Sequence, residues 1–305
     1  MRGAEGEAGM QEWPFMEARE LLRAARMEEE ALRAALQYAD RHKRLVERGA
    51  ACAYEGEPPD YALLTRYGPL QRLAILCAKL PELKSRWQDT GLPEAVFYST
   101  ASDLSLHAAL YLSRTGKPGL SRGDALWLRH LFGLRIFKLG SLQFQLFEMV
   151  YLDEETVGAP YMTFSPEQKR ELPAGTPVIN VHVQVGADLS PDAVERSLRE
   201  AVSFFAAYFP EHRYAAFLCY SWLLYPGMRA LLPADSNIRA FASRFTILSE
   251  IRDDEQAIER LFGGRCLAKR GAAQTSLQRN ALLHPEGLGF ACGVLWRDRV
   301  KPANL

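Results

Sequence analysis

The sequence predicts two regions of different fold class, an all-α region over residues 1–132 and an α/β region over residues 133–305 in which helices cover a sheet. In the first region, apolar residues recur at helical spacing among charged ones. The period then changes at Gly133, and β-like runs alternate with a strongly amphipathic helix. A length of 305 residues agrees with two modest domains, at roughly 150 residues per domain.

The first region is expected to consist of helices with short breaks. Residues 13–49 have a helical apolar pattern, and Gly49 is the expected stop. Pro69 lies inside the next pattern and predicts a kink or a fresh helix start. Residues 92–112 are again mostly helical, and a capping box that begins at Ser121 predicts a short final helix.

The second region is expected to open with a β-hairpin. Residues 134–139 and 142–151 form two β-like runs around Gly140-Ser141, a pair that suits a type II′ turn. Residues 178–185 then alternate cleanly, with Ile179, Val181, Val183 and Val185 on one face and Asn180, His182 and Gln184 on the other. This alternation predicts a central strand with one apolar and one polar face.

A helix over residues 190–209 follows, with Ser190 as its cap and Pro191 at its first position. An aromatic-rich apolar run at 214–224, a possible strand at 246–251 and a last strand at 290–296 complete the sheet.

Composition excludes several classes of protein. The 37 basic and 37 acidic residues balance, which argues against a nucleic-acid partner. Five scattered cysteines without a Cys-x-x-Cys pair favour a reducing cytoplasm and no structural zinc. No signal-peptide pattern and no run of about 18 uncharged apolar residues occurs, so we expect neither membrane insertion nor an anchor. The expected partner is a small-molecule substrate, and the oligomeric state is left open.

Four segments of the second region resemble a known family. They are residues 137–144, residues 181–186, residues 217–224 and residues 232–238, which read FKLGSLQF, VHVQVG, FLCYSWLL and LPADSNI. These segments resemble an acyltransferase-domain family that pairs an N-acyltransferase N-terminal domain with a GNAT-like C-terminal domain. The resemblance covers nearly the whole chain and implies domains at 1–132 and 133–305. For the second domain it implies a mixed, mostly antiparallel sheet.

The same resemblance implies a function, N-acyl transfer from acyl-CoA or acetyl-CoA. In GNAT enzymes, the central strand parts from its neighbour and the pantetheine chain enters the gap. The pyrophosphate then lies at the following helix N-terminus, where backbone N–H groups favour anions. By similarity, the cofactor-binding residues are Val183, Gln184, Val185, Gly186 and Ser190.

The loop departs from the family pattern, which supports an alternative function. Ala187 and Leu189 stand where that pattern has glycines, and Asp188 and Asp192 add carboxylates near the expected pyrophosphate. The alternative is a non-catalytic small-molecule-binding or regulatory module. A third hypothesis is an interaction scaffold built on the N-terminal helices.

Four residues of the second region are candidate catalytic groups. His182 is the first candidate for the base, because imidazole titrates near neutrality, and Glu148 is the second. Tyr220 is the candidate acid, with Tyr225 as the other phenol. Ser221 either holds or contacts the reacting group, or bonds the backbone.

The candidate substrate-binding residues are Asn180, Cys219, Ser236 and Asn237. Core packing is the alternative for Cys219, and a helix cap is the alternative for Ser236 and Asn237. A Gly-rich basic stretch from Arg260 to Arg279 is a phosphate-binding candidate or a solvated loop.

Overall fold

The computed structural model describes residues 14–56, 62–153, 161–253, 255–262 and 276–303. The chain divides into two compact units, residues 1–135 and 136–305. Within the described ranges, no helix combines the length and the apolar character needed to cross a membrane.

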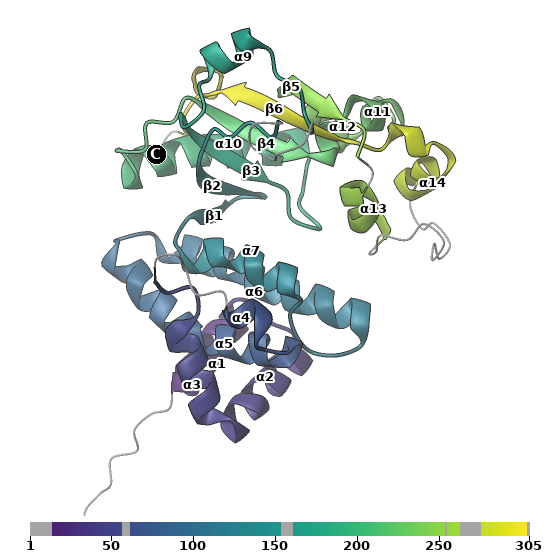
Figure 1. Ribbon diagram of the computed structural model, residues 1–305. Coiled ribbons are helices and arrows are strands. Elements are labelled where there is room, and N and C mark those ends of the chain that lie inside the picture. The colour runs from purple at the N-terminus through teal and green to yellow at the C-terminus, as the bar shows by residue number, and fades with distance from the viewer. Residues whose placement is uncertain (1–13, 57–61, 154–160, 254, 263–275, 304–305) are drawn as a thin grey trace, which may run out of the picture. The chain divides into compact units, whose positions relative to one another are not determined.

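The first unit is helical, as the sequence predicts (Figure 1). Its described helices are α1 (Pro14–Ala24), α2 (Glu29–Arg41), α3 (Lys43–Cys52), α4 (Ala62–Thr65), α5 (Pro69–Asp89), α6 (Glu94–Thr115) and α7 (Arg122–Phe132). Helix α5 packs against α1, α2 and α3, and its Leu73, Leu76 and Leu80 are fully buried. Burying a leucine side chain contributes about 1.5–3 kcal/mol, so α5 is the main core element of this unit.

Two local predictions for this unit differ in outcome. Pro69 is the first residue of α5, where the missing N–H costs no hydrogen bond, so the fresh start is correct. Gly49 does not stop a helix, because α3 continues to Cys52. A Cβ at Gly49 would lie 2.7 Å from Cδ1 of Ile75, so this glycine serves the close approach of α3 to α5.

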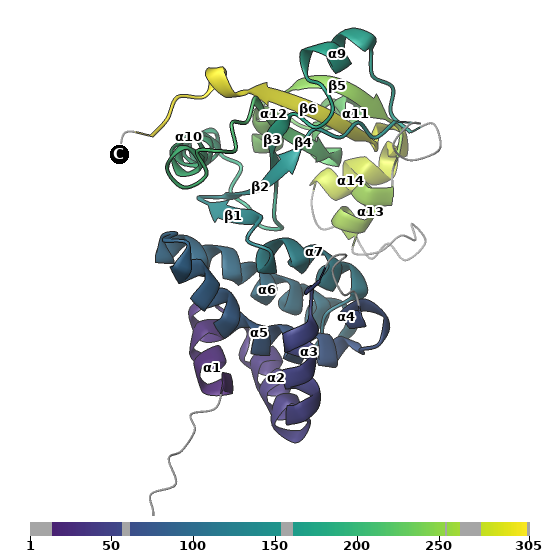
Figure 2. The same cartoon turned by 60° about the vertical axis from the view of Figure 1, so that its left-hand side comes forward.

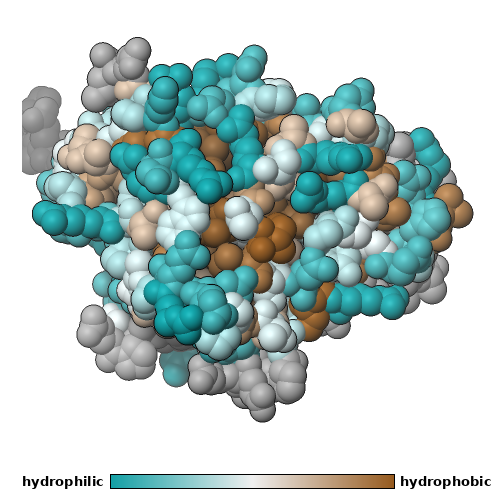
Figure 3. All heavy atoms as spheres, turned by 90° about the horizontal axis from the view of Figure 1, so that it is seen from above, coloured by the Kyte–Doolittle hydropathy of each residue, from teal (hydrophilic) through white to brown (hydrophobic). Residues whose placement is uncertain are grey.

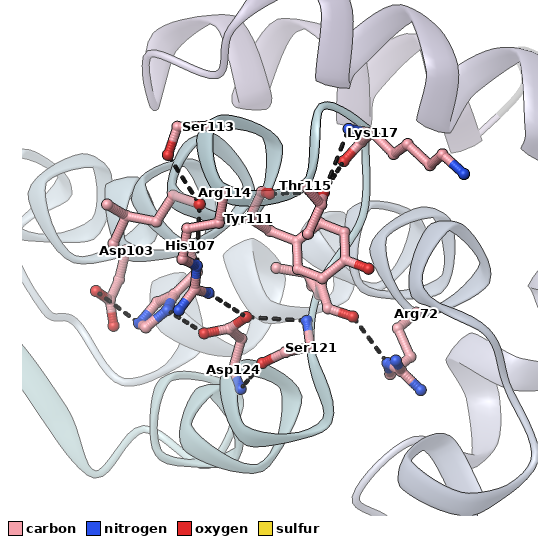
Figure 4. Close-up of polar contacts among 12 residues, drawn as sticks. Arg72, Asp103, His107, Tyr111, Ser113, Arg114, Thr115, Lys117, Ser121 and Asp124 are labelled. Atoms are coloured by element: carbon pink, nitrogen blue, oxygen red, sulfur yellow. Dashed lines mark hydrogen bonds and ion pairs between the residues drawn. The ribbon is translucent and has the colours of Figure 1, made fainter. Parts of the chain in front are cut away.

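Helices α6 and α7 are joined by partly buried polar contacts (Figure 4). Nδ1 of His107 lies 2.9 Å from Oδ1 of Asp124, and Nε1 of Trp127 donates to Oδ2 of Asp103 at 2.8 Å. The capping box at Ser121 is confirmed, since its hydroxyl accepts from the Asp124 N–H and its own N–H donates to Oδ2 of Asp124. Asp124 therefore both caps α7 and ties it to α6.

The second unit contains a six-stranded sheet of order β1-β2-β3-β4-β6-β5. The strands are β1 (Ile136–Leu139), β2 (Leu142–Glu148), β3 (Pro177–His182), β4 (Ala216–Ser221), β5 (Thr246–Ile251) and β6 (Phe290–Trp296). All neighbours pair antiparallel except β3 and β4, which are parallel. This confirms the predicted mixed, mostly antiparallel sheet.

Helices surround the sheet of this unit. They are α9 (Pro166–Glu171), α10 (Pro191–Tyr208), α11 (Pro226–Ala230), α12 (Asn237–Ala242), α13 (Glu255–Phe262) and α14 (Ser276–Leu283). Helix α10 is seen nearly end-on beside β1 and β2 in Figure 2, whereas α9 lies beside β5.

The two faces of the sheet are covered differently. Phe137 on β1 contacts Phe204, Phe205 and Phe209 at ring-centroid distances of 5.1–5.9 Å, so α10 and the residue after it cover its face. On the other face, Met149, Tyr151 and Phe164 form an apolar cluster with Val178 and Leu218. Seen from above, the molecule shows a central apolar area bordered by hydrophilic residues (Figure 3).

The Asp124 contacts predict a pH-dependent contribution to stability. Burial opposes ionisation of this carboxyl, but hydrogen bonds from His107 and Ser121 outweigh it and lower its pKa to about 2 from 3.8. Because the folded pKa is depressed, the contribution is full above the unfolded value and is lost as pH falls towards 2. We expect Asp124→Asn to lower the free energy of unfolding by about 2 kcal/mol at pH 6.

Denaturant titration of the full chain, with hydrogen exchange in α6 and α7 as the local readout, measures this difference. It should shrink as pH is lowered from 4 towards 2. Asp40→Asn, at an exposed position of α2, controls for the change in net charge. A difference that stays constant with pH would contradict this role of the Asp124 carboxylate.

Candidate active site

The only parallel pair in the described sheet is also its shortest ladder. Strands β3 and β4 pair only at Ile179 with Phe217 and at Asn180 with Leu218. Before these pairs the strands remain joined, since the Ala215 N–H donates to the Pro177 carbonyl at 3.0 Å. After them, Val181 and His182 have no ladder partner in β4. The strands therefore part at their carboxyl ends, where backbone groups are left for another partner.

His182 stands on the polar face at this opening. Register places Gln143 opposite His182 and Gln145 opposite Asn180, so all four side chains share one face. The His182 ring is half-buried, and its Nε2 lies 2.8 Å from Oε1 of Gln145. Asn180 and Gln143 are 7% and 1% exposed, and Oδ1 of Asn180 and Nε2 of Gln143 have no hydrogen-bond partner.

The two amide atoms without a hydrogen-bond partner lower the stability of the folded protein. A buried donor or acceptor without a partner costs about 1–3 kcal/mol, so folded proteins rarely keep one without a use. Asn180 is the predicted substrate-binding residue of this strand, and the structure places it directly before the point where β3 leaves β4.

The segment after β3 is a turn. Strand β3 ends at His182, so the prediction that Val183 to Val185 continue it was wrong. The Ala187 N–H donates to the Gln184 carbonyl at 3.1 Å, and Gly186 has φ 79°, which favours glycine. The chain must reverse here to start α10, and this requirement overrides the alternating pattern.

The start of α10 combines groups of both charges. Pro191 has no N–H, and the Ser190 side chain makes no capping bond. The Ser190 N–H donates to Oδ1 of Asp188 at 2.8 Å, a bond that lowers the pKa of Asp188, with Arg196 adding a smaller effect. Asp188 is therefore a carboxylate held at a helix N-terminus.

Arg244 also reaches this end of the helix. Its guanidinium lies 2.6 Å from Oε2 of Glu195 and donates to the Pro191 carbonyl at 3.3 Å. Sequence reasoning did not find Arg244 or Arg196. Arg196 lies within a helix where it reads as a surface charge, and Arg244 comes from a segment about 50 residues further along the chain.

Two phenols follow the opening, and they differ in environment. The Tyr220 hydroxyl donates to the Val150 carbonyl, and its ring stacks on Phe290 at 6.2 Å. Burial raises the pKa of Tyr220 well above its usual value, with the neighbouring Cys292 adding to the effect. Tyr220 is thus held in the apolar cluster.

Tyr225 lies after the end of β4 in a slot made by glycines. A Cβ at Gly227 would lie 2.7 Å from the Tyr225 ring, and a Cβ at Gly289 would lie 2.6 Å from it. The Tyr225 hydroxyl has no hydrogen-bond partner among the described residues. Its ring is fixed while its hydroxyl is not engaged.

Four other predicted residues have local structural surroundings that the structure describes. Cys219 is fully buried on the opposite face, and burial raises the pKa of its thiol. Ser221 accepts a hydrogen bond from the Leu223 N–H at 3.1 Å, which is the backbone role considered for it. Ser236 occupies the N-cap position of α12 without a side-chain bond, and Asn237 is exposed.

The remaining predicted site residues are Glu148 and the basic stretch from Arg260 to Arg279. Glu148 is exposed at the far end of β2, and alternation places it on the face opposite His182. Most of the basic stretch, residues 263–275, lies outside the described residues. Among the residues that are described, no group of three or more His, Cys, Asp or Glu side chains is arranged to hold a metal ion.

Comparison with known proteins confirms the resemblance. Residues 16–134 match the model of the N-acyltransferase N-terminal domain, and residues 136–295 match that of the GNAT-like C-terminal domain. No curated protein matches the sequence.

Solved structures of acyltransferases share the fold. A crystal structure of an acyltransferase in complex with decanoyl-CoA and teicoplanin has 23% sequence identity and a TM-score of 0.72, over 92% of this chain and 88% of that chain. A mutant acyltransferase in complex with octanoyl-CoA has 23% identity and a TM-score of 0.71, over the same shares of the two chains. An acyltransferase in complex with decanoyl-CoA has 24% identity and a TM-score of 0.68, again over 92% and 88%.

The two tyrosines give a matched test of the geometry. Tyr220→Phe leaves the Val150 carbonyl without its donor, so we expect the free energy of unfolding to fall by about 1–3 kcal/mol. Tyr225→Phe removes a hydroxyl without a partner and should change it by less than about 0.5 kcal/mol. Denaturant titration compares the variants, and equal losses would contradict the assigned contacts.

Proposed function

Because the chain belongs to the family that joins an N-acyltransferase N-terminal domain to a GNAT-like C-terminal domain, we propose that it transfers an acyl group from acyl-CoA to the amine of a small molecule. The observation that carries the proposal is the short β3–β4 ladder, which ends beside His182. A thin, flexible pantetheine chain matches an opening between two strands, because it can replace the missing backbone hydrogen bonds.

The donor site is supported by the start of α10. Unpaired N–H groups of the first helical turn attract phosphate oxygens, and Arg196 and Arg244 add positive charge near this end. The acyl-CoA ligands of the similar solved structures favour the same class of donor. Acetyl-CoA is the shortest donor of this class, and no metal is required for the reaction.

In the proposed reaction, His182 takes a proton from the acceptor amine as the nitrogen attacks the thioester carbonyl carbon. Backbone N–H groups at the end of β3 stabilise the oxygen of the tetrahedral intermediate. The C–S bond then breaks, and the departing thiolate takes a proton from the phenol of Tyr225. The products are the N-acylated acceptor and free CoA. His182 then releases its proton to solvent, and solvent returns a proton to Tyr225.

The proposal assigns the acid to Tyr225 and not to Tyr220. The Tyr220 proton is committed to the Val150 carbonyl, whereas the Tyr225 hydroxyl is not engaged and its ring is held between glycines. Asn180 is the proposed contact for a polar group of the acceptor, since Oδ1 of Asn180 is an acceptor without a donor.

A specific observation also favours the non-catalytic alternative. The Ser190 N–H donates to the Asp188 carboxylate, so one backbone donor at the expected pyrophosphate position is already hydrogen-bonded. If this contact excludes CoA, the chain binds another small molecule between the strands without turnover. Calorimetry with acetyl-CoA and longer acyl-CoA separates the two functions, because only the enzyme binds the thioester and then releases CoA.

Replacement of His182 tests the base. We expect His182→Ala to lower kcat by about 10²–10⁴-fold while acyl-CoA binding persists, because the change removes proton transfer and not donor contacts. Free thiol release with a panel of primary amines gives the rate, and mass spectrometry identifies the N-acyl product. Glu148→Gln in the same assay tests the second candidate for the base. A loss of kcat equal to or larger than that of His182→Ala would assign the base to Glu148.

Replacement of Tyr225 tests the acid. Tyr225→Phe should lower kcat by about tenfold or more with a CoA thioester, and by less with an acyl donor whose thiol is more acidic. A more acidic thiol leaves more easily without a proton. The difference in the loss of kcat between the two acyl donors therefore measures proton donation by the Tyr225 phenol. A loss of the same size for both donors would argue against proton transfer from Tyr225.

A further inference from the structure

Gln145 is the residue of β2 that contacts the His182 ring. It lies in the middle of β2, where its backbone is paired with Ile136 of β1 on one side and with Asn180 of β3 on the other. Its side chain is 4% exposed. Both its main chain and its amide are therefore held in place, and the amide meets the imidazole diagonally across two strands.

The chemistry of this contact determines a tautomer. Oε1 of Gln145 is a carbonyl oxygen and can only accept, so the 2.8 Å contact requires the proton to be on Nε2 of His182. A neutral imidazole has one N–H and one lone pair, so the lone pair is then on Nδ1. Only that nitrogen can take a proton from an attacking amine.

Both protonation states keep this bond. When Nδ1 gains a proton, Nε2–H still donates to Gln145, and the carbonyl dipole stabilises the positive charge that forms. A carboxylate at the same place would instead favour the charged ring before reaction. A neutral amide thus orients the base and leaves it able to accept a proton.

We propose that Gln145 is a positioning residue that holds neutral His182 as the Nε2–H tautomer, with the lone pair of the base on Nδ1. The catalytic meaning of this arrangement rests on the proposed function, whereas the tautomer itself does not. Sequence reasoning missed Gln145, because a glutamine in an apolar strand gives no chemical signal until its neighbour on β3 is known.

The test is a measurement of the imidazole nitrogens. The chain has six histidines, so the protein labelled with ¹⁵N in the histidine rings gives few signals, and His182→Asn identifies the pair that belongs to His182. In alkaline solution, we expect Nε2 to show the shift of a protonated nitrogen and Nδ1 that of an unprotonated one. The reverse tautomer in the unmodified protein would overturn the proposal.

Matched variants separate positioning from packing. Gln145→Leu removes the acceptor and should produce a mixture of tautomers, while Gln145→Glu keeps an acceptor oxygen at the same reach and should preserve Nε2–H. Gln143→Leu is the control, because Gln143 has the same side chain, strand and face and is directly opposite His182, yet its Nε2 makes no hydrogen bond. It should leave the tautomer unchanged. If Gln145→Leu does not fold, Gln145→Met replaces it in this test, because methionine also lacks the acceptor oxygen.

Kinetics then connects the tautomer to function. We expect Gln145→Leu to lower kcat about tenfold with an acyl-CoA KM changed by less than about twofold, because orientation of the base is lost and donor binding is not. An altered tautomer with unchanged kcat, or an unchanged tautomer in Gln145→Leu, would overturn the positioning role. If the unmodified protein acylates no amine, the proposed function fails, and the nitrogen shifts still decide the tautomer.

Discussion

The second unit depends on one constraint, the parallel contact of β3 with β4 inside an otherwise antiparallel sheet. Every antiparallel pair extends through most of its strands, whereas this pair has two register positions and then ends. The antiparallel partners β2 and β6 hold the outer sides of β3 and β4, so the strands can diverge without loss of the sheet. The loss of ladder hydrogen bonds is confined to one place, and backbone groups there are available to a ligand.

The chemical groups of the site follow from strand alternation at that place. One face of β3 is apolar and packs towards α10, and the other carries Asn180 and His182. The same alternation in β2 adds Gln143 and Gln145 opposite them. Towards the start of β3 this face continues into the apolar cluster around Val178 and Leu218. The polar side chains thus lie towards the end where the strands part, and the apolar cluster covers this face towards the start of β3.

Local patterns predicted most of the fold and little of the site. The strands at 246–251 and 290–296 and the capping box at Ser121 were predicted correctly, because their signals lie in adjacent residues. Residues 183–185 were assigned wrongly to β3, since a two-residue period persists through a turn that only the position of α10 requires. Gln145, Arg244 and the Tyr225 slot have no local signal, because each depends on residues brought together by the fold. The sequence could therefore name candidate residues such as His182, but not the residues that contact them.

In the proposed function, cations near the start of α10 take the place of the glycines that usually hold phosphate in such a loop. Glycines in such a loop let backbone N–H groups approach an anion closely, but an anion can also be held by guanidinium groups. Here Asp188 takes one N–H, and Arg196 and Arg244 supply cations near the same end of the helix. An incoming pyrophosphate carries more negative charge than a single carboxylate and offers more acceptor oxygens. Because the Asp188 contact involves one exposed side chain and no buried group, its displacement requires only a local change in the loop, and the strands and the His182–Gln145 pair remain as they are.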